Sequence, residues 1–87
     1  MKKEINTTKI WLVYLLECSD GTFYAGITND LEHRLATHNA GLGAKYTRGR
    51  TPVRLLELKE VKSHSEALQQ EYQLKKLPKS KKRSFFK

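Results

Sequence analysis

The sequence contains very little cysteine and no long hydrophobic run, and both absences exclude whole classes of protein. Its single cysteine, Cys18, has no partner for a disulfide within the chain, and no Cys and His spacing fits a zinc site. No apolar run typical of a signal peptide opens the chain, and the longest apolar stretch, residues 10–16, is far shorter than the roughly 20 residues that span a bilayer. We therefore expect a soluble, cytoplasmic protein that makes no contact with a membrane.

Acidic residues are also scarce. The chain carries 17 Lys and Arg against 9 Asp and Glu, a net charge of +8. Residues 33–56 contain bases but no acid, and the same holds for the segment after Glu71. Such a field attracts polyanions, so a nucleic-acid backbone is the expected partner. The alternative is an idle basic surface or a solvated tail.

Two strand-like segments open the chain. Residues 10–17 contain a continuous apolar run typical of a central strand, and residues 22–27 are again rich in strand formers. The loop between them decides which way the tyrosines face: after a two-residue turn, Tyr14 and Tyr24 would lie on opposite faces. A three-residue loop ending in left-handed Gly21 would instead pair residue 14 with 26 and residue 16 with 24. Gly21 favours the three-residue loop, which puts both tyrosines on one face.

The first helix is expected over about residues 30–39, capped by Thr28 or Asn29. Its periodicity places Arg34 and His38 on the apolar stripe that meets the sheet. Polar groups on a stripe that faces the core need a partner or a function.

The second helix opens with Ser63 and Glu66 at the spacing of a capping box and ends before Pro78. Its apolar face is expected to consist of Ala67, Leu68 and Leu74. Glu71 falls in the middle of that face, where a carboxylate is costly unless it is paired or binds a metal ion. Glu71 is therefore a candidate functional residue on the grounds of its position alone.

A glycine-rich basic loop over residues 41–52 leads to a third strand over residues 53–60, and a short helix is expected over residues 79–87, with its phenylalanines packing back on the core. At 87 residues there is room for one domain, placed here over residues 10–87 after a flexible N-terminus of residues 1–9. The predicted fold is an α+β sandwich in the order ββαβα(α). It consists of a three-stranded antiparallel sheet flanked by helices, with the site on one sheet face.

These residues, taken in order, resemble the GIY-YIG nuclease domain over about residues 10–80. The first tripeptide is Leu-Val-Tyr and keeps only its tyrosine, Tyr14, whereas the second, Tyr-Ala-Gly from Tyr24 to Gly26, differs only at its alanine. Arg34 stands ten residues after Tyr24, and Glu71 begins a Glu-x-x-Leu-Lys segment similar to the family's metal-binding helix. The segment Gly-Leu-Gly-Ala-Lys-Tyr-Thr-Arg, residues 41–48, resembles the small, single-domain bacterial branch of this superfamily.

The resemblance implies a divalent-metal-dependent endonuclease, a phosphodiester hydrolase that acts on nucleic acid, with DNA as the expected substrate and a 5′-phosphate and a 3′-hydroxyl as products. Glu71 would hold one Mg²⁺ or Mn²⁺, and Arg34 would grip the scissile phosphate. Tyr14 or Tyr24 would pass a proton, a role that His38 could share or assume because it occupies the place of a second active-site tyrosine. The residues expected to contact the nucleic acid are Gly26, Lys45, Arg48, Arg50 and Lys75.

Each of these residues also has a structural alternative. The tyrosines can be core aromatics, and the histidine can be a satisfied buried side chain. Arg34 can pair with Glu17 or Glu57, and Glu71 can be neutralised by a nearby base. For the whole chain, the alternative is a non-catalytic or partner-activated nucleic-acid-binding module. A homodimer or a protein partner could supply specificity.

Overall fold

Three strands form a single antiparallel sheet in the computed structural model, which describes residues 10–87. The flexible segment predicted over residues 1–9 lies outside the described residues. The strands are β1 (Trp11–Glu17), β2 (Phe23–Thr28) and β3 (Arg54–Val61). Their spatial order is β2-β1-β3, so β1 is the central strand.

The hairpin has the register that the three-residue loop predicts. Tyr14 pairs with Gly26, and Leu16 pairs with Tyr24. Gly21 has φ 85°, a left-handed conformation that glycine adopts without steric cost. Tyr14 and Tyr24 therefore lie on the same face of the sheet.

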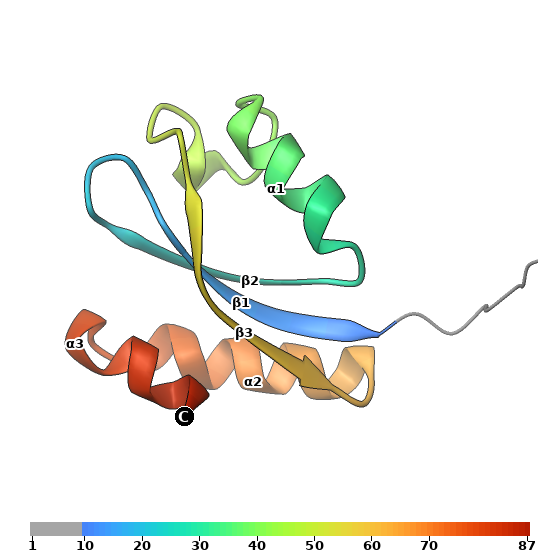
Figure 1. Cartoon of the computed structure of the whole chain (residues 1–87). Coiled ribbons are helices and arrows are strands. Elements are labelled where there is room, and N and C mark those ends of the chain that lie inside the picture. The colour runs from blue at the N-terminus through green and yellow to red at the C-terminus, as the bar shows by residue number, and fades with distance from the viewer. Residues whose placement is uncertain (1–9) are drawn as a thin grey trace, which may run out of the picture.

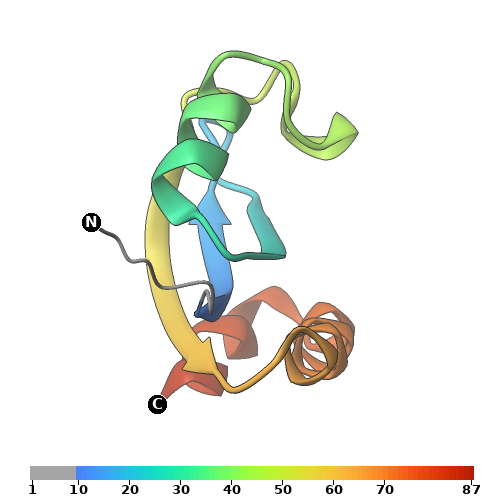
Figure 2. The ribbon, with the colours of Figure 1, turned by 90° about the vertical axis from the view of Figure 1, so that its right-hand side faces the viewer.

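The helices cover the sheet in two layers (Figures 1 and 2). They are α1 (Leu31–Asn39), α2 (His64–Lys76) and α3 (Lys79–Lys82), with the 3₁₀ turns η1 (Lys45–Thr47) and η2 (Arg83–Phe86). Figure 1 shows α1 on one side of the sheet and α2 and α3 on the other. The predicted α+β sandwich is thus confirmed. In the described part of the chain, no helix has the length and apolar character needed to cross a membrane.

The alternation of side chains along β1 divides the hydrophobic core in two. On the α2 side, the buried residues are Val13, Leu15, Ala25, Val61, Ala67 and Leu74, with Phe85 and Phe86 packed against them. On the α1 side, the buried residues are Tyr14, Leu16, Cys18 and Val53, with Tyr24, Leu31 and Leu35 packed against them. Since β1 contributes to both clusters, it is covered on both faces, as its continuous apolar run predicts.

Two details of the helices differ from the prediction. Asp30 caps α1, because its carboxylate accepts a hydrogen bond from the backbone N–H of His33; neither Thr28 nor Asn29 takes this position. On α2, Leu68 is 47% exposed and lies outside the buried face, which is built from Ala67 and Leu74. Leu68 is about 100° around the helix from Ala67, and this rotation carries it away from the sheet.

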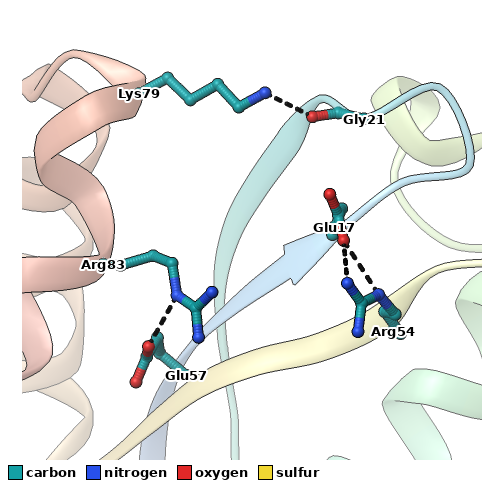
Figure 3. Close-up of polar contacts among 6 residues, drawn as sticks. All are labelled: Glu17, Gly21, Arg54, Glu57, Lys79 and Arg83. Carbon is teal, nitrogen blue, oxygen red and sulfur yellow. Dashed lines mark hydrogen bonds and ion pairs between the residues drawn. The ribbon is translucent and has the colours of Figure 1, made fainter.

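Polar contacts fasten the C-terminal segment to the sheet, as Figure 3 shows. Lys79 Nζ donates to the carbonyl of Gly21 at 2.7 Å, and Arg83 Nε donates to Glu57 at 2.9 Å. Arg54 Nε donates to Glu17 at 2.9 Å on the neighbouring strand. Both acids that were considered as partners of Arg34 are therefore occupied by other arginines.

Candidate active site

The candidate site is centred on Tyr14, which lies in the middle of the central strand. Its side chain is 1% exposed, and its hydroxyl lies 3.2 Å from Nε2 of His38 on α1. Gly26, its cross-strand neighbour, leaves the space that the phenol fills, because a Cβ there would overlap the hydroxyl and lie 2.5 Å from Cζ. Gly26 was expected to admit the nucleic acid; in the structure it admits Tyr14.

His38 is held at both ring nitrogens. The side chain is fully buried, and its Nδ1 lies 2.8 Å from Oγ1 of Thr47 in η1. The residue is thus a satisfied buried histidine, and it also contacts the central tyrosine. These two roles are compatible, because a catalytic imidazole needs an orienting partner on the nitrogen that does not react.

The environment keeps both members of this pair neutral. Burial, together with the nearby positive charge of Arg34, lowers the pKa of His38. Burial also raises the pKa of Tyr14, and the charges of Tyr24 and Glu71 act in the same direction, while Arg34 opposes them. At neutral pH the hydroxyl of Tyr14 is therefore a donor and the imidazole of His38 is uncharged.

The lowered pKa of His38 predicts a loss of stability in mild acid. Below about pH 6.5 the unfolded chain protonates this histidine, whereas the folded chain resists protonation. The unfolded state then binds more protons, so the free energy of unfolding falls as the pH drops from about 6.5 through the folded-state pKa. The groups that face the imidazole are Tyr14, Tyr24, Arg34 and Thr47.

Urea unfolding between pH 8 and pH 5 measures this effect, with His38→Gln as the comparison. We expect the free energy of unfolding of the variant to depend less steeply on pH than that of the wild type. His33→Gln, which alters an exposed histidine of the same helix, serves as the control. Parallel pH profiles for the wild type and His38→Gln would contradict the prediction.

Tyr24 lies on the edge strand within a stack of aromatic and cationic groups. Its ring centroid is 5.4 Å from that of His38 and 5.8 Å from that of Tyr46, which is stacked on it. Nζ of Lys75 lies 5.8 Å from the ring centroid of Tyr24, and the guanidinium of Arg50 lies 4.1 Å from that of Tyr46. These contacts hold the Tyr24 ring beside His38.

Arg34 lies on α1 one turn before His38 and is half-buried. Within residues 10–87 it has no acidic partner at ion-pair distance. The hydroxyl of Tyr14 beside it raises the pKa of Arg34, and burial acts in the opposite direction. A half-buried guanidinium without an acidic partner is available to bind an anion.

Glu71 reaches the site from the other layer. It lies on α2, which packs against β2 and covers the opposite face of the sheet. Its side chain is 20% exposed, at the margin of the buried face rather than in its middle. Its negative charge helps to raise the pKa of Tyr14, and its carboxylate pairs with Lys75 at 3.2 Å. The prediction of a site on one sheet face does not hold for Glu71, because α2 covers the face opposite to α1. Its ion-pair partner Lys75 lies over the ring of Tyr24 at the β2 edge of the sheet.

The basic residues expected to bind nucleic acid lie on two sides of this edge. Figure 2 shows α2 and the segment around η1 projecting on the side of the sheet where β2 lies. Lys45, the first residue of η1, and Arg48, which follows η1 and donates to the carbonyl of Gly43, are exposed. Arg50 is held by Asp20 at 3.1 Å and by the ring of Tyr46. Their role in binding remains a prediction.

Two residues of the site were not selected from the sequence. Thr47 contacts His38, and Tyr46 stacks on Tyr24. Both lie in the segment 41–48 that carries the resemblance to the small branch of the superfamily. No periodic pattern marks them, since a loop carries neither a helical nor a strand repeat.

A site of two tyrosines, an arginine, a histidine and a glutamate on this fold defines a class of protein. Residues 10–84 match the model of the GIY-YIG catalytic domain, and the chain belongs to this family. The family associates the chain with nuclease activity.

The relatives place the chain more narrowly, among the UPF0213 proteins. It is 54% identical over 74 residues to a UPF0213 protein of Halobacterium salinarum, covering 85% of this chain and 96% of that one. The match to a UPF0213 protein of Oceanobacillus iheyensis is 53% identical over 70 residues and covers 80% of this chain and 81% of that one.

Solved structures of similar proteins support the fold. The solution NMR structure of a UPF0213 protein from Bacillus halodurans has a TM-score of 0.54 at 45% identity and covers 86% of this chain and 80% of that one. The NMR structure of a protein from E. faecalis has a TM-score of 0.60 at 40% identity, with 92% and 86% covered.

Proposed function

We propose that this protein is a divalent-metal-dependent endonuclease that hydrolyses phosphodiester bonds, with DNA as the expected substrate. The observation that carries the proposal is the hydrogen bond between Tyr14 and a neutral His38, with Arg34 beside it and Glu71 near. Phosphodiester hydrolysis needs a group for each of three tasks: a phosphate anchor, a proton acceptor and positive charge at the phosphoryl oxygens.

Arg34 is the phosphate anchor. Its guanidinium offers a planar fork of donors that matches two phosphate oxygens, and no acid among the described residues competes for it. An anchored phosphate places the scissile bond against Tyr14, whose hydroxyl lies beside the same guanidinium.

Tyr14 and His38 form the proton acceptor. An isolated phenol near pKa 10 is a poor base at neutral pH, and burial raises the pKa of Tyr14 further. The hydrogen bond to Nε2 of His38 offers a relay: the attacking water gives a proton to Tyr14 Oη while Tyr14 gives its own proton to Nε2. The water oxygen bonds to phosphorus, the bond to the 3′-oxygen breaks, and that oxygen takes a proton from solvent.

Glu71 is the carboxylate that would hold the metal ion. In the described part of the chain, no three Asp, Glu, His or Cys side chains gather into a ligand cluster. A lone carboxylate fits Mg²⁺ or Mn²⁺, because Mg²⁺ keeps several waters and takes further oxygens from the substrate phosphate. When bound, the ion would supply positive charge at the phosphoryl oxygens and acidify the attacking water. In the structure, the ammonium of Lys75 lies 3.2 Å from the carboxylate of Glu71 and neutralises its charge. The metal ion would take over this neutralisation when it binds.

The experiment is cleavage of a labelled panel of single-stranded, duplex, nicked and branched DNA and of RNA, with Mg²⁺, Mn²⁺ or a chelator. We expect metal-dependent cleavage of at least one DNA substrate, with 5′-phosphate ends on the products. Binding of the panel is measured in the same samples. Binding without cleavage under any metal condition would overturn the proposal and favour the nucleic-acid-binding module.

A further inference from the structure

We infer that Thr47 is a positioning residue of this site: its hydroxyl holds His38 in the tautomer that can accept the proton of Tyr14. The inference rests on the proposed function, in which His38 is the terminal proton acceptor. Neither the family match nor the relatives assign a role to Thr47.

The hydroxyl of Thr47 has a single proton to donate. Oγ1 lies 2.9 Å from the backbone carbonyl of Ala44, which can only accept, so the hydroxyl proton is given to Ala44. Oγ1 must then accept from its other neighbour, Nδ1 of His38, at 2.8 Å. The hydrogen of the neutral imidazole is therefore on Nδ1.

The position of that hydrogen decides what Nε2 can do. A neutral imidazole has one N–H, so with the hydrogen on Nδ1 the lone pair is on Nε2. The only side-chain group at hydrogen-bond distance from Nε2 within residues 10–87 is the hydroxyl of Tyr14, at 3.2 Å. Tyr14 is thereby the donor, and the direction of the relay is set by Ala44 and Thr47.

The alternative tautomer is penalised by burial. With the hydrogen on Nε2, Thr47 would have to turn its proton towards Nδ1, and the carbonyl of Ala44 would lose this donor. The carbonyl of Ala44 would keep the backbone N–H of Thr47 as a donor, so the cost of this tautomer is the hydrogen bond lost by the hydroxyl of Thr47, a residue that is 0% exposed.

The segment around Thr47 is fitted closely to the imidazole. The backbone N–H of Thr47 also donates to the carbonyl of Ala44, at 3.0 Å, which closes the 3₁₀ turn. A Cβ on Gly43 would overlap Nδ1 of His38 and lie 2.9 Å from its Cγ. Only glycine at position 43 lets the loop lie so close to the imidazole of His38. The hydroxyl of Thr47 is therefore held at a set distance from Nδ1.

The test compares Thr47→Val, which keeps the shape and removes the hydroxyl, with Thr47→Ser, which keeps the hydroxyl. Thr37→Val is the matched control. The hydroxyl of Thr37 donates to the backbone carbonyl of His33 within α1 and forms no hydrogen bond with His38. We expect Thr47→Val to lower kcat about 10- to 100-fold, the usual effect of losing an orienting partner of an imidazole. Thr47→Ser and Thr37→Val should stay within about threefold of the wild type, with Kd for an uncleavable substrate unchanged in all three.

Long-range ¹⁵N NMR of histidine-labelled protein supplies a readout that does not depend on activity. We expect the Nδ1–H tautomer of His38 in the wild type and in Thr47→Ser, and a mixture of tautomers in Thr47→Val. An unchanged kcat in Thr47→Val, or an Nε2–H tautomer in the wild type, would overturn the inference while the cleaving wild type upheld the proposed function. A wild type that cleaves nothing would overturn both the proposed function and the catalytic role given to Thr47. The tautomer of His38 would then show only whether Thr47 accepts a hydrogen bond from Nδ1.

Discussion

Glu71→Gln is expected to lower the rate of cleavage by about 10²- to 10³-fold while the affinity for nucleic acid changes little. Glutamine has the same size and shape, but it carries no charge with which to hold a divalent cation beside the phosphate. Initial rates at saturating Mg²⁺ and at saturating Mn²⁺, together with Kd for the same substrate in a chelator, measure the two effects separately.

The structure also limits how far this substitution can affect stability. The ion pair between Glu71 and Lys75 is partly exposed, and such pairs contribute less than about 1 kcal/mol. Glu60→Gln, which neutralises an exposed carboxylate on β3, is the matched control and should cleave at the wild-type rate. If Glu71→Gln melts at a lower temperature yet cleaves normally, the carboxylate is structural and its assignment to the metal is wrong.

Gly26→Ala is expected to damage both stability and cleavage, although it adds only one methyl group. The new Cβ would overlap the hydroxyl of Tyr14, which is 1% exposed and packed on the α1 side of the sheet, so the ring has no free space into which to move. Overpacking of this kind costs about 1–3 kcal/mol of unfolding free energy. Displacement of Tyr14 also breaks its hydrogen bond to His38, so cleavage should fall by about 10²-fold or more. Urea unfolding and initial rates measure the two losses.

A double-mutant cycle tests whether the methyl group added at position 26 clashes with Tyr14. In a Tyr14→Ala background the ring is absent, so adding Gly26→Ala should cost almost nothing further in unfolding free energy. If the two costs are additive instead, the alanine at position 26 acts on the backbone of β2 and not on Tyr14.

Much of the fold could be predicted because local signals in the chain agree with one another. Gly21 selects the three-residue loop, and that loop sets the register of the hairpin and puts Tyr14 and Tyr24 on one face. Ser63 and Glu66 have the capping-box spacing, and Ser63 does accept from the backbone N–H of Glu66 at 3.0 Å.

Two predictions about the buried face of α2 were wrong, and both have the same physical cause. Leu68 is apolar and was assigned to the buried face, but periodicity gives only the angle between residues and not the direction of the sheet. For the same reason Glu71 was placed in the middle of that face, whereas its side chain is 20% exposed and pairs with Lys75, which lies over Tyr24 of β2.

The candidate site was predicted less completely than the fold, because its loop residues carry no period. Tyr14, Arg34 and His38 could be brought together from strand and helix geometry. Thr47 could not, since only the folded loop carries its hydroxyl to a histidine nine positions earlier. The contact of Gly26 with nucleic acid remains a prediction, and the structure shows a separate reason for glycine at this position, the close approach of the Tyr14 hydroxyl.

The residues of the candidate site come from both sides of the sheet, and a chain that is still being synthesised therefore lacks some of them. Tyr14, His38 and Thr47 are all present once residue 47 has been synthesised, whereas Glu71 belongs to a helix that is synthesised later and covers the opposite face. A nascent or half-folded chain would thus carry the basic residues proposed to bind nucleic acid while it lacks the carboxylate proposed to hold the metal ion. Docking of α2 would complete the proposed site, so its catalytic competence would arrive together with completed folding.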